Sequence, residues 1–480
     1  MAYEDLREFI ERLEAEGELA RIKHEISPIL EMTEIAVRAV RNGGKALLFE
    51  NPKGYDIPVL MNAFGTERRM KLALEVERFE EIGERLVKLT KLKSIMDGIK
   101  GFKDLMSFKP KIVRSGACKE VIMDDPNLDK FPILKCWPKD GGRYITLPVV
   151  ITKDPETGEL NAGMYRMQVF DSKTTGMHWQ IHKHGALHFK KLAEKGEDKL
   201  EVAVAIGVDP AVLYASTAPL PENVNEFNFA GFIRKERVKM VECETVDLLV
   251  PANAEIVLEG YVRIDELRLE GPFGDHTGYY TPPEPYPVFH ITCITHREEP
   301  IYHTTVVGKP PMEDSWLGKA TERIFLPLIK MIHPEIVDIN LPVEACFHNL
   351  AIVSIKKRYP GHAKKVMFAL WSMGLLSLTK IVIVVDDDVN VHNMREVIWA
   401  VTTRFDPARD VVIIPDAPTD ALDHSTYKPC LGGKLGIDAT RKWKEEGYER
   451  EWPEVVEMSE DVKKKIDLIW NDLKNLIFNK

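Results

Sequence analysis

Residues 147–169 read LPVVITKDPETGELNAGMYRMQV, and this stretch decides the fold class of the middle of the chain. A mostly apolar run over residues 147–152 is followed by the turn-forming segment Asp154–Gly158 and by a second extended segment, residues 161–169. Two β-prone runs separated by a turn that contains proline and glycine are typical of a β-hairpin. The stretch therefore predicts antiparallel β-structure.

The same pattern of short strands and turns extends from about residue 115 to residue 310. A long series of short strands favours a barrel or a sandwich. The further strands that we expect cover residues 200–206, 255–262, 288–294 and 301–307, and we expect another turn over residues 171–176.

On both sides of this β-rich section, the pattern changes to helices that alternate with strands, which is typical of α/β structure. Near the N-terminus, Leu6, Phe9, Ile10 and Leu13 recur at helical spacing. The other expected helices cover residues 31–41, 319–331, 362–371 and 395–402, and the expected strands cover residues 46–50, 351–355, 381–385 and 410–414.

A chain of 480 residues is too long for one compact core. We expect an N-terminal α/β domain over residues 1–112, a central β-domain over residues 113–312 and a C-terminal α/β domain over residues 313–455. Residues 456–480 predict an amphipathic helix, which would dock on its own body or on a neighbouring subunit.

Composition limits the classes of partner and compartment. The net charge of −10 is modest and no domain-sized stretch is strongly basic, so we do not expect a nucleic-acid partner. The six cysteines form no CxxC pair, which argues against a zinc ribbon, a redox dithiol or a disulfide scaffold. The N-terminus lacks an apolar signal core, and no apolar run approaches the length of a membrane span. We therefore expect a cytoplasmic protein.

The segment Glu270–Tyr280 reads EGPFGDHTGYY and places two acids and a histidine on a backbone shaped by glycine and proline. Glu270 and Asp275 lie at opposite ends of one tight bend, where two carboxylates can differ in pKa and divide acid and base work. A solvated turn is the alternative. The apolar and aromatic flanks predict that the bend is packed; they are Leu267, Leu269, Phe273, Tyr279 and Tyr280.

Arg166 is the charged residue of the second half of the hairpin. Strand alternation would put it on one face with Ala162 and Met164. An arginine among small and apolar neighbours needs an anion, and its planar fork suits a carboxylate or a phosphate. A salt bridge at the strand edge is the alternative.

Three separate segments offer ligands for a metal. An oxygen from Asn161, a nitrogen from a histidine in the segment His178–His184 and the carboxylate of Glu226 would form a mixed site that suits manganese or magnesium better than structural zinc. Such a metal could tie a bound phosphate to the protein. Taken singly, the histidines are also compatible with an ordinary surface, and Glu226 with a solvated loop.

Taken together and in this order, these segments resemble the UbiD family of decarboxylases, which use a prenylated flavin mononucleotide. The resemblance spans nearly the whole chain and implies a central flavin-binding split β-barrel and a homo-oligomer, either a dimer or a hexamer. The segments that carry it are residues 161–166, 182–186, 221–226, 270–280, 359–365, 379–390 and 436–440.

The resemblance also implies roles for individual residues. Asn161 and Glu226 match the metal ligands, and His182 fits the third better than His184; the metal, usually manganese, bridges to the flavin phosphate, with potassium often nearby. Arg166, Glu270 and Asp275 match the catalytic network. The residues implied to hold the cofactor are Asn161, Met164, Tyr165, Arg166, His178, Trp179, Gln180, Lys183, His184 and Glu226.

The chemistry that the family performs makes sense of these residues. Loss of carbon dioxide from an unsaturated or aromatic acid needs an electron sink, which no standard side chain supplies. We expect Arg166 to orient the substrate carboxylate, Glu270 to tune the flavin and move protons, and Asp275 to protonate the carbon left behind. Members that act on ferulic-type acids have glutamate at the position of Asp275. Members of the quinone pathway have aspartate there, as this chain does.

The expected function is therefore a reversible, non-oxidative decarboxylase that depends on a flavin prenyltransferase for its cofactor. Two substrates fit the resemblance: a polyprenyl-hydroxybenzoate in quinone synthesis, which would require contact with a membrane surface, and trans-anhydromevalonate phosphate in an archaeal isoprenoid route. One alternative is a metal-dependent hydrolase that activates water at Asn161, His182 and Glu226. Another is a flavin-binding protein without turnover.

Overall fold

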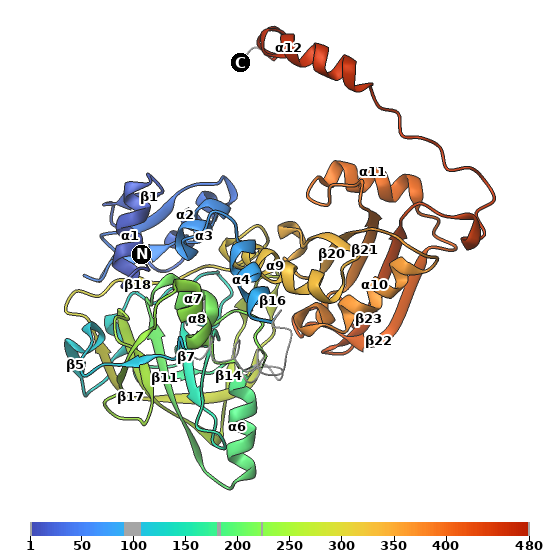
Figure 1. The fold of residues 1–480 in the computed structure, drawn as a ribbon. Coiled ribbons are helices and arrows are strands. Elements are labelled where there is room, and N and C mark those ends of the chain that lie inside the picture. The colour runs from blue at the N-terminus through green and yellow to red at the C-terminus, as the bar shows by residue number, and fades with distance from the viewer. Residues whose placement is uncertain (1, 91–106, 180–183, 222–223, 479–480) are drawn as a thin grey trace.

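The computed structural model describes residues 2–90, 107–179, 184–221 and 224–478. Figure 1 shows an N-terminal section and a central section that lie against each other, a C-terminal section beside them, and a last helix that stands apart. The division into domains at residues 112, 312 and 455 stays a prediction.

The N-terminal section packs helices on a four-stranded sheet of order β1-β2-β3-β18. Its first helix, α1, begins after Asp5, whose side chain accepts hydrogen bonds from two backbone N–H groups, and it buries the four apolar residues that predicted it. The sheet contains β1 (Leu19–Ile22), β2 (Ala46–Phe49), β3 (Val59–Met61) and β18 (Tyr302–His303), and the helices are α1 (Leu6–Ala15), α2 (Glu31–Arg41), α3 (Glu67–Leu74) and α4 (Glu80–Thr90).

The central sheet has seven strands: six follow the order β10-β17-β14-β11-β7-β8, and β5 also pairs with β17. Among the described residues, β8 and β10 lie at the two ends of this path and do not pair with each other, so closure into a split β-barrel is not confirmed. Both end strands are short, which leaves little backbone to join the two edges. The strands are β5 (Val121–Met123), β7 (Val149–Lys153), β8 (Leu160–Gly163), β10 (Thr174–Gly176), β11 (Lys199–Ile206), β14 (Ile256–Glu270) and β17 (Glu284–His296).

The predicted hairpin at residues 147–169 is confirmed in its first half. Strands β7 and β8 pair in antiparallel register, with Lys153 opposite Leu160. The second half is not one strand, because β8 ends at Gly163 and β9 (Met167–Gln168) pairs instead with β6 (Tyr144–Ile145). The predicted alternation that placed Arg166 beside Ala162 and Met164 is therefore wrong: Arg166 lies in the break between two strands.

Shorter elements cover this sheet and carry the bend. A three-stranded sheet of order β13-β12-β4 lies in the same section, and a two-stranded hairpin of β15 and β16 holds the segment between Gly274 and Tyr280. These elements are β4 (Lys111–Ile112), β12 (Lys239–Glu242), β13 (Leu249–Pro251), β15 (Phe273–Gly274), β16 (Tyr280–Thr281), α6 (His184–Glu194), α7 (Pro210–Ala215) and α8 (Glu226–Arg234).

The C-terminal section is a five-stranded sheet of order β19-β20-β21-β23-β22 with parallel pairing at its centre. The predicted helix over residues 362–371 is confirmed as α10, whereas α9 begins earlier than predicted, at Glu313. The elements are β19 (Ile336–Asn340), β20 (Leu350–Ile355), β21 (Ile381–Asp386), β22 (Val411–Pro418), β23 (Leu431–Ala439), α9 (Glu313–Ile332), α10 (His362–Trp371), α11 (Met394–Arg404) and α12 (Glu460–Ile477).

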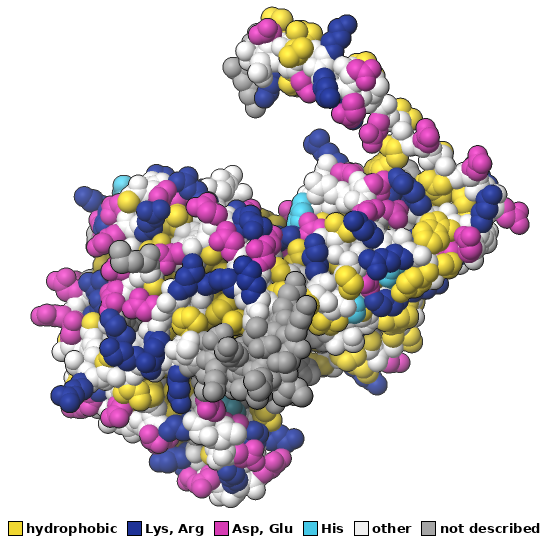
Figure 2. Space-filling model, in the orientation of Figure 1, with side chains coloured by type: hydrophobic (Ala, Val, Ile, Leu, Met, Phe, Trp, Pro, Cys, Tyr) yellow, Lys and Arg dark blue, Asp and Glu magenta, His cyan; other side chains and the backbone are white. Residues whose placement is uncertain are grey.

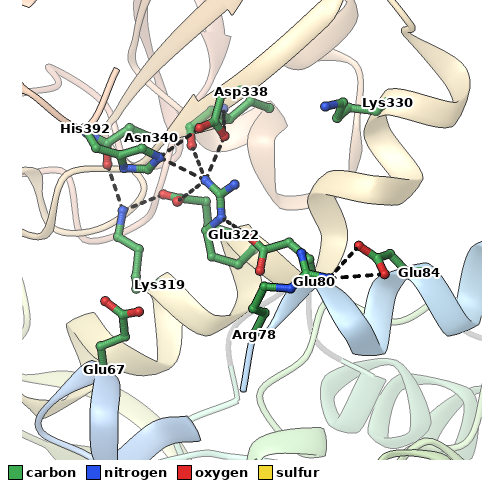
Figure 3. A network of polar contacts seen from close by, with 12 residues as sticks. Glu67, Arg78, Glu80, Glu84, Lys319, Glu322, Lys330, Asp338, Asn340 and His392 are labelled. Carbon is green, nitrogen blue, oxygen red and sulfur yellow. Dashed lines mark hydrogen bonds and ion pairs between the residues drawn. The ribbon is translucent and has the colours of Figure 1, made fainter. Parts of the chain in front are cut away.

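Helix α9 connects the three sections. Helix α4 approaches it so closely that a Cβ atom on Gly83 would lie 1.9 Å from the Ile324 carbonyl oxygen. The Arg323 guanidinium of α9 contacts Glu80 of α4 at 2.9 Å and Asp338 of β19, in the C-terminal section, at 2.8 Å. Figure 3 shows this polar network between α4, α9 and the strand that follows.

Candidate active site

Arg166 is the centre of a buried network of carboxylates. Its Nε donates to Glu270 Oε1 at 3.0 Å, its Nη1 forms an ion pair with Asp275, and its Nη2 donates to Thr281 Oγ1 at 3.1 Å. The guanidinium also lies 4.6 Å from the centre of the Phe273 ring. A guanidinium has five N–H donors, so these contacts leave donors for a further anion.

Glu270 is the last residue of β14, and its side chain is fully buried. Its Oε1 atom accepts from Arg166 and lies 3.0 Å from His178 Nδ1. Its Oε2 atom is buried without a hydrogen-bond partner among the described residues. Gly176 faces this oxygen, and a Cβ atom there would lie only 2.9 Å from it. One carboxylate oxygen is thus fixed by the protein, and the other is left for a ligand or a proton.

Asp275 lies in the bend between β15 and β16, where its backbone N–H donates to the Tyr279 carbonyl at 3.0 Å. Gly278 adopts a φ of +84° in this bend, which favours glycine. The prediction that the flanks are packed holds for Phe273, which is buried. It is wrong for Leu267, Leu269 and Tyr279, whose side chains are exposed.

The neighbours of Asp275 keep its carboxyl group ionised. Burial alone would raise the pKa of this carboxyl group, but hydrogen bonds from His276 and the charge of Arg166 outweigh burial and hold the pKa well below its usual range. Burial lowers the pKa of His276, yet the Asp275 carboxylate raises it overall to about 9. Asp275 is therefore ionised at neutral pH and must take up a proton before it can act as an acid.

The two described members of the expected metal set lie on adjacent elements. Asn161 is in β8 and Glu226 is the first residue of α8, and both are buried. The Ala162 backbone N–H donates to Glu226 Oε2 at 3.0 Å, which joins the strand to the helix. His182 lies outside the described residues, so the third expected ligand has no described position.

The residues expected to hold the cofactor flank these two groups. Tyr165 and Trp179 are buried, and the Tyr165 hydroxyl accepts from the Gly185 backbone N–H at 3.4 Å. The Trp179 indole nitrogen has no hydrogen-bond partner in the described ranges. Gln180 and Lys183 lie outside the described residues, Met164 packs partly buried against the core, and of His184 only the backbone, at the start of α6, is described.

Two contacts of the network were not predicted from the sequence. Thr281 directly follows the segment Glu270–Tyr280, so its position in the sequence could have indicated that it lies near Arg166. His178 was expected beside the cofactor, but its contact with Glu270 joins positions 92 residues apart, and no local pattern encodes such a pairing. The His178 ring also packs against Tyr286, with ring centres 4.1 Å apart.

Comparison with known families explains this arrangement. Three domain models of 3-octaprenyl-4-hydroxybenzoate carboxy-lyase match the chain: the N-terminal domain at residues 10–86, the Rift-related domain at residues 111–310 and the C-terminal domain at residues 315–439. The chain belongs to the UbiD family. It is therefore a carboxy-lyase. The two alternative functions, a metal-dependent hydrolase and a flavin-binding protein without turnover, are wrong.

Individual relatives cover the full length of the chain. An uncharacterized protein of Archaeoglobus fulgidus is 77% identical over 482 residues, which span 99% of this chain and 100% of the relative. The vanillic acid decarboxylase of Sedimentibacter hydroxybenzoicus in its closed form is 32% identical, with a TM-score of 0.85 and coverage of 99% and 100%. HmfF, the UbiD-class enzyme of Pelotomaculum thermopropionicum, in complex with FMN, is 34% identical, with a TM-score of 0.80 and coverage of 94% and 97%.

A search of the described helices for membrane spans gave a negative result. None of them combines the length and the apolar character that crossing a bilayer requires.

Proposed function

We propose that this UbiD-family protein is a prenylated-FMN-dependent, reversible, non-oxidative decarboxylase of an α,β-unsaturated or aromatic carboxylic acid. The observation that carries the proposal is the buried guanidinium of Arg166, which joins the carboxylate at the end of β14 to the carboxylate in the bend between β15 and β16. Family membership supports the reaction type, and the FMN complex of HmfF supports the flavin. The similarity to a vanillic acid decarboxylase supports an aromatic acid as one substrate class.

The residues of the site fit such a cofactor. Asn161, Glu226 and His182 would hold a manganese or magnesium ion, because an amide oxygen, a carboxylate and an imidazole suit these cations, and potassium would bind nearby. Trp179 Nε1 and Glu270 Oε2 are buried polar atoms that lack protein partners in the described ranges, as expected beside a polar ligand. When bound, prenylated FMN supplies the electron sink for decarboxylation.

The side chains then have separate tasks. Among the described residues, Arg166 has more N–H donors than its hydrogen bonds to Glu270, Asp275 and Thr281 use, and it would orient the substrate carboxylate. Glu270 would exchange a proton through Oε2, the oxygen that has no hydrogen-bond partner among the described residues. Asp275, ionised at rest, would take up a proton and deliver it to the carbon from which carbon dioxide has left.

Two pathway positions remain open to this chemistry. The substrate would be a polyprenyl-hydroxybenzoate in quinone synthesis, reached by peripheral contact with a membrane, or trans-anhydromevalonate phosphate in isoprenoid synthesis. In both cases a flavin prenyltransferase would supply the cofactor.

The test is reconstitution of the full chain with prenylated FMN, followed by carbon dioxide release and deuterium exchange on these two acids and on vanillic acid. We expect turnover on at least one of them. We expect Glu270→Gln and Asp275→Asn to lower turnover by about 10²- to 10⁴-fold, the range of general acid–base catalysis, while the flavin absorbance is retained.

A matched pair of arginines provides the control. Arg268 lies over Phe170 at 4.5 Å, much as Arg166 lies over Phe273, but it is exposed. Arg166→Lys should abolish turnover, whereas Arg268→Lys should leave it within about twofold. Full turnover in Glu270→Gln, or no carbon dioxide from any of the acids, would contradict the proposal.

A further inference from the structure

Three side chains from distant segments meet beside the bend that carries Asp275. His276 belongs to the bend, His348 lies in the turn after residue 345, and Asp420 follows β22. One nitrogen of each histidine and one oxygen of the aspartate all lie within 4.8 Å of one another. The two imidazole rings have centres 5.3 Å apart. His276 touches the Arg166 network through Asp275, and none of the three residues belongs to the expected manganese site.

Both histidines are oriented as metal ligands are. His276 Nδ1 lies 3.0 Å from Asp275 Oδ1, and His348 Nδ1 lies 2.7 Å from the Cys346 carbonyl oxygen. A hydrogen bond from Nδ1 to a carboxylate or carbonyl fixes the ring and presents Nε2 to a metal. His348 Nε2 lies 2.6 Å from Asp420 Oδ2, and His276 Nε2 is buried without a hydrogen-bond partner among the described residues.

The charge around the cluster favours a cation. The carboxylate of Asp275 is matched by Arg166. In the part of the chain that the structure describes, neither Asp420 nor the nearby Asp314 has an ion pair with a lysine or an arginine. Burial raises the pKa of Asp314 to about 7, so the charge argument rests on Asp420, whose carboxylate a divalent ion would balance and an anionic ligand would repel.

We propose that His276, His348 and Asp420 bind a divalent transition-metal ion at a second metal site, separate from the one expected at Asn161 and Glu226. Two imidazole nitrogens and one carboxylate suit zinc, manganese or iron(II) and leave at least one coordination position open. The ion would displace two protons, the one between His348 Nε2 and Asp420 and the one that His276 Nε2 carries at neutral pH. It would join the bend that holds Asp275 to two loops of the C-terminal section.

The geometry requires a modest adjustment. Metal–ligand bonds of about 2.0–2.2 Å place tetrahedral ligand atoms roughly 3.3 Å apart, so the 4.8 Å span has to contract. All three ligands lie in loops, where such a shift does not disturb a helix or a strand.

Cobalt(II) is the probe, because its visible absorption reports on coordination. The full chain with Glu226→Gln, which weakens the manganese site, is stripped with a chelator and titrated with cobalt(II). We expect one equivalent to bind with a visible spectrum. Adding His348→Gln or Asp420→Asn should remove the spectrum or weaken binding by at least about tenfold, whereas His424→Gln, an exposed histidine in the same loop as Asp420, should change neither.

Thermal unfolding gives a second readout that does not depend on activity. Zinc(II) should raise the melting temperature of the Glu226→Gln protein but not that of the protein with Asp420→Asn added. The two proteins should melt alike in chelator, which shows that the nearly isosteric change leaves the fold intact. Absence of cobalt uptake, or an unchanged spectrum in Asp420→Asn and His348→Gln, would overturn the proposal.

Discussion

At the scale of single residues, His303 shows how burial alone alters a titratable group. It is buried in β18 against Phe64, with ring centres 5.6 Å apart, and neither ring nitrogen has a hydrogen-bond partner in the described ranges. Burial lowers its pKa to about 3. The folded protein therefore keeps this histidine neutral at pH values where the unfolded chain, with a pKa of about 6.5, binds a proton.

The sign of the pH dependence follows. The unfolded state binds more protons below pH 6.5, so the stability that the neutral histidine allows is present above pH 6.5 and is lost as the pH falls toward 3. The free energy of unfolding falls by at most about 1.4 kcal/mol per pH unit, which amounts to about 2 kcal/mol between pH 6.5 and 5. We expect His303→Leu to reduce the loss of melting temperature between pH 7.5 and 5. The exposed His24, changed to Leu, should not, and equal losses in all three proteins would contradict this account.

Arg166, Glu270, Asp275 and His178 could be named from the sequence, but Thr281 and several contacts within the network were not predicted. Glu270 and Asp275 are close in sequence, but the prediction that one bend holds both is wrong, because β15 lies between them. Arg166 is 104 residues from Glu270, and its direction depended on where β8 ends. Strand alternation assumed that β8 continued, and the break after Gly163 made that assumption wrong.

At the scale of elements, the N-terminus of α8 positions Glu226. Asn225 caps this helix by accepting from the Phe227 backbone N–H at 2.9 Å, and it donates to the Leu160 carbonyl at 2.8 Å. One side chain thus sets the helix start and ties it to β8. Asn393 caps α11 in a similar way, at 3.2 Å from the Arg395 backbone N–H.

This pair of caps gives a matched experiment. Asn225→Ala and Asn393→Ala should each cost about 1 kcal/mol of stability, the usual effect of a lost cap. Only Asn225→Ala should also weaken manganese binding, by about 10- to 100-fold, because it removes support from Glu226 without removing a ligand. Manganese titration of both variants measures this. Equal manganese affinities would show that the cap does not position Glu226.

Element prediction succeeded where the hydrophobic period was unbroken and failed where pairing was long-range. Helix α2 and helix α10 have the predicted bounds, because each carries one buried apolar stripe. The strand expected over residues 301–307 shortens to Tyr302–His303, since its partner is β3 of the N-terminal section. A sheet closes only if its two end strands contact each other. The local sequence patterns of β8 and β10 do not indicate whether these strands do so.

At the scale of the whole molecule, α12 projects from the end of an extended segment, and Figure 2 shows hydrophobic side chains on its surface. Ile466 and Ile469 belong to the predicted apolar stripe and are 39% and 47% exposed. Such a face is stable in water only when something covers it. The expectation that a second copy of the chain covers this face in a homo-oligomer stays a prediction.

The oligomer can be tested directly. Ile466→Glu with Ile469→Glu should lower the mass measured by light scattering at a fixed protein concentration, because charges on the stripe oppose its burial. Lys465→Glu, a single charge change directly before Ile466, is the control and should leave the mass unchanged. A monomeric wild-type chain, or an unaltered mass in the double variant, would contradict the prediction.

Because all three sections pack on helix α9, cutting the chain at the expected boundaries, residues 112 and 312, would expose buried surfaces. Its surface is shared, since Gly83 packs on it from the N-terminal section, Tyr214 contacts it from the central section and Asp338 from the C-terminal one. A polypeptide that ends near residue 312 would leave the buried side of α4 in water, and one that begins there would carry α9 without its covers. The division at residues 112 and 312 stays a prediction, and truncated proteins cut at either position will make poor expression targets.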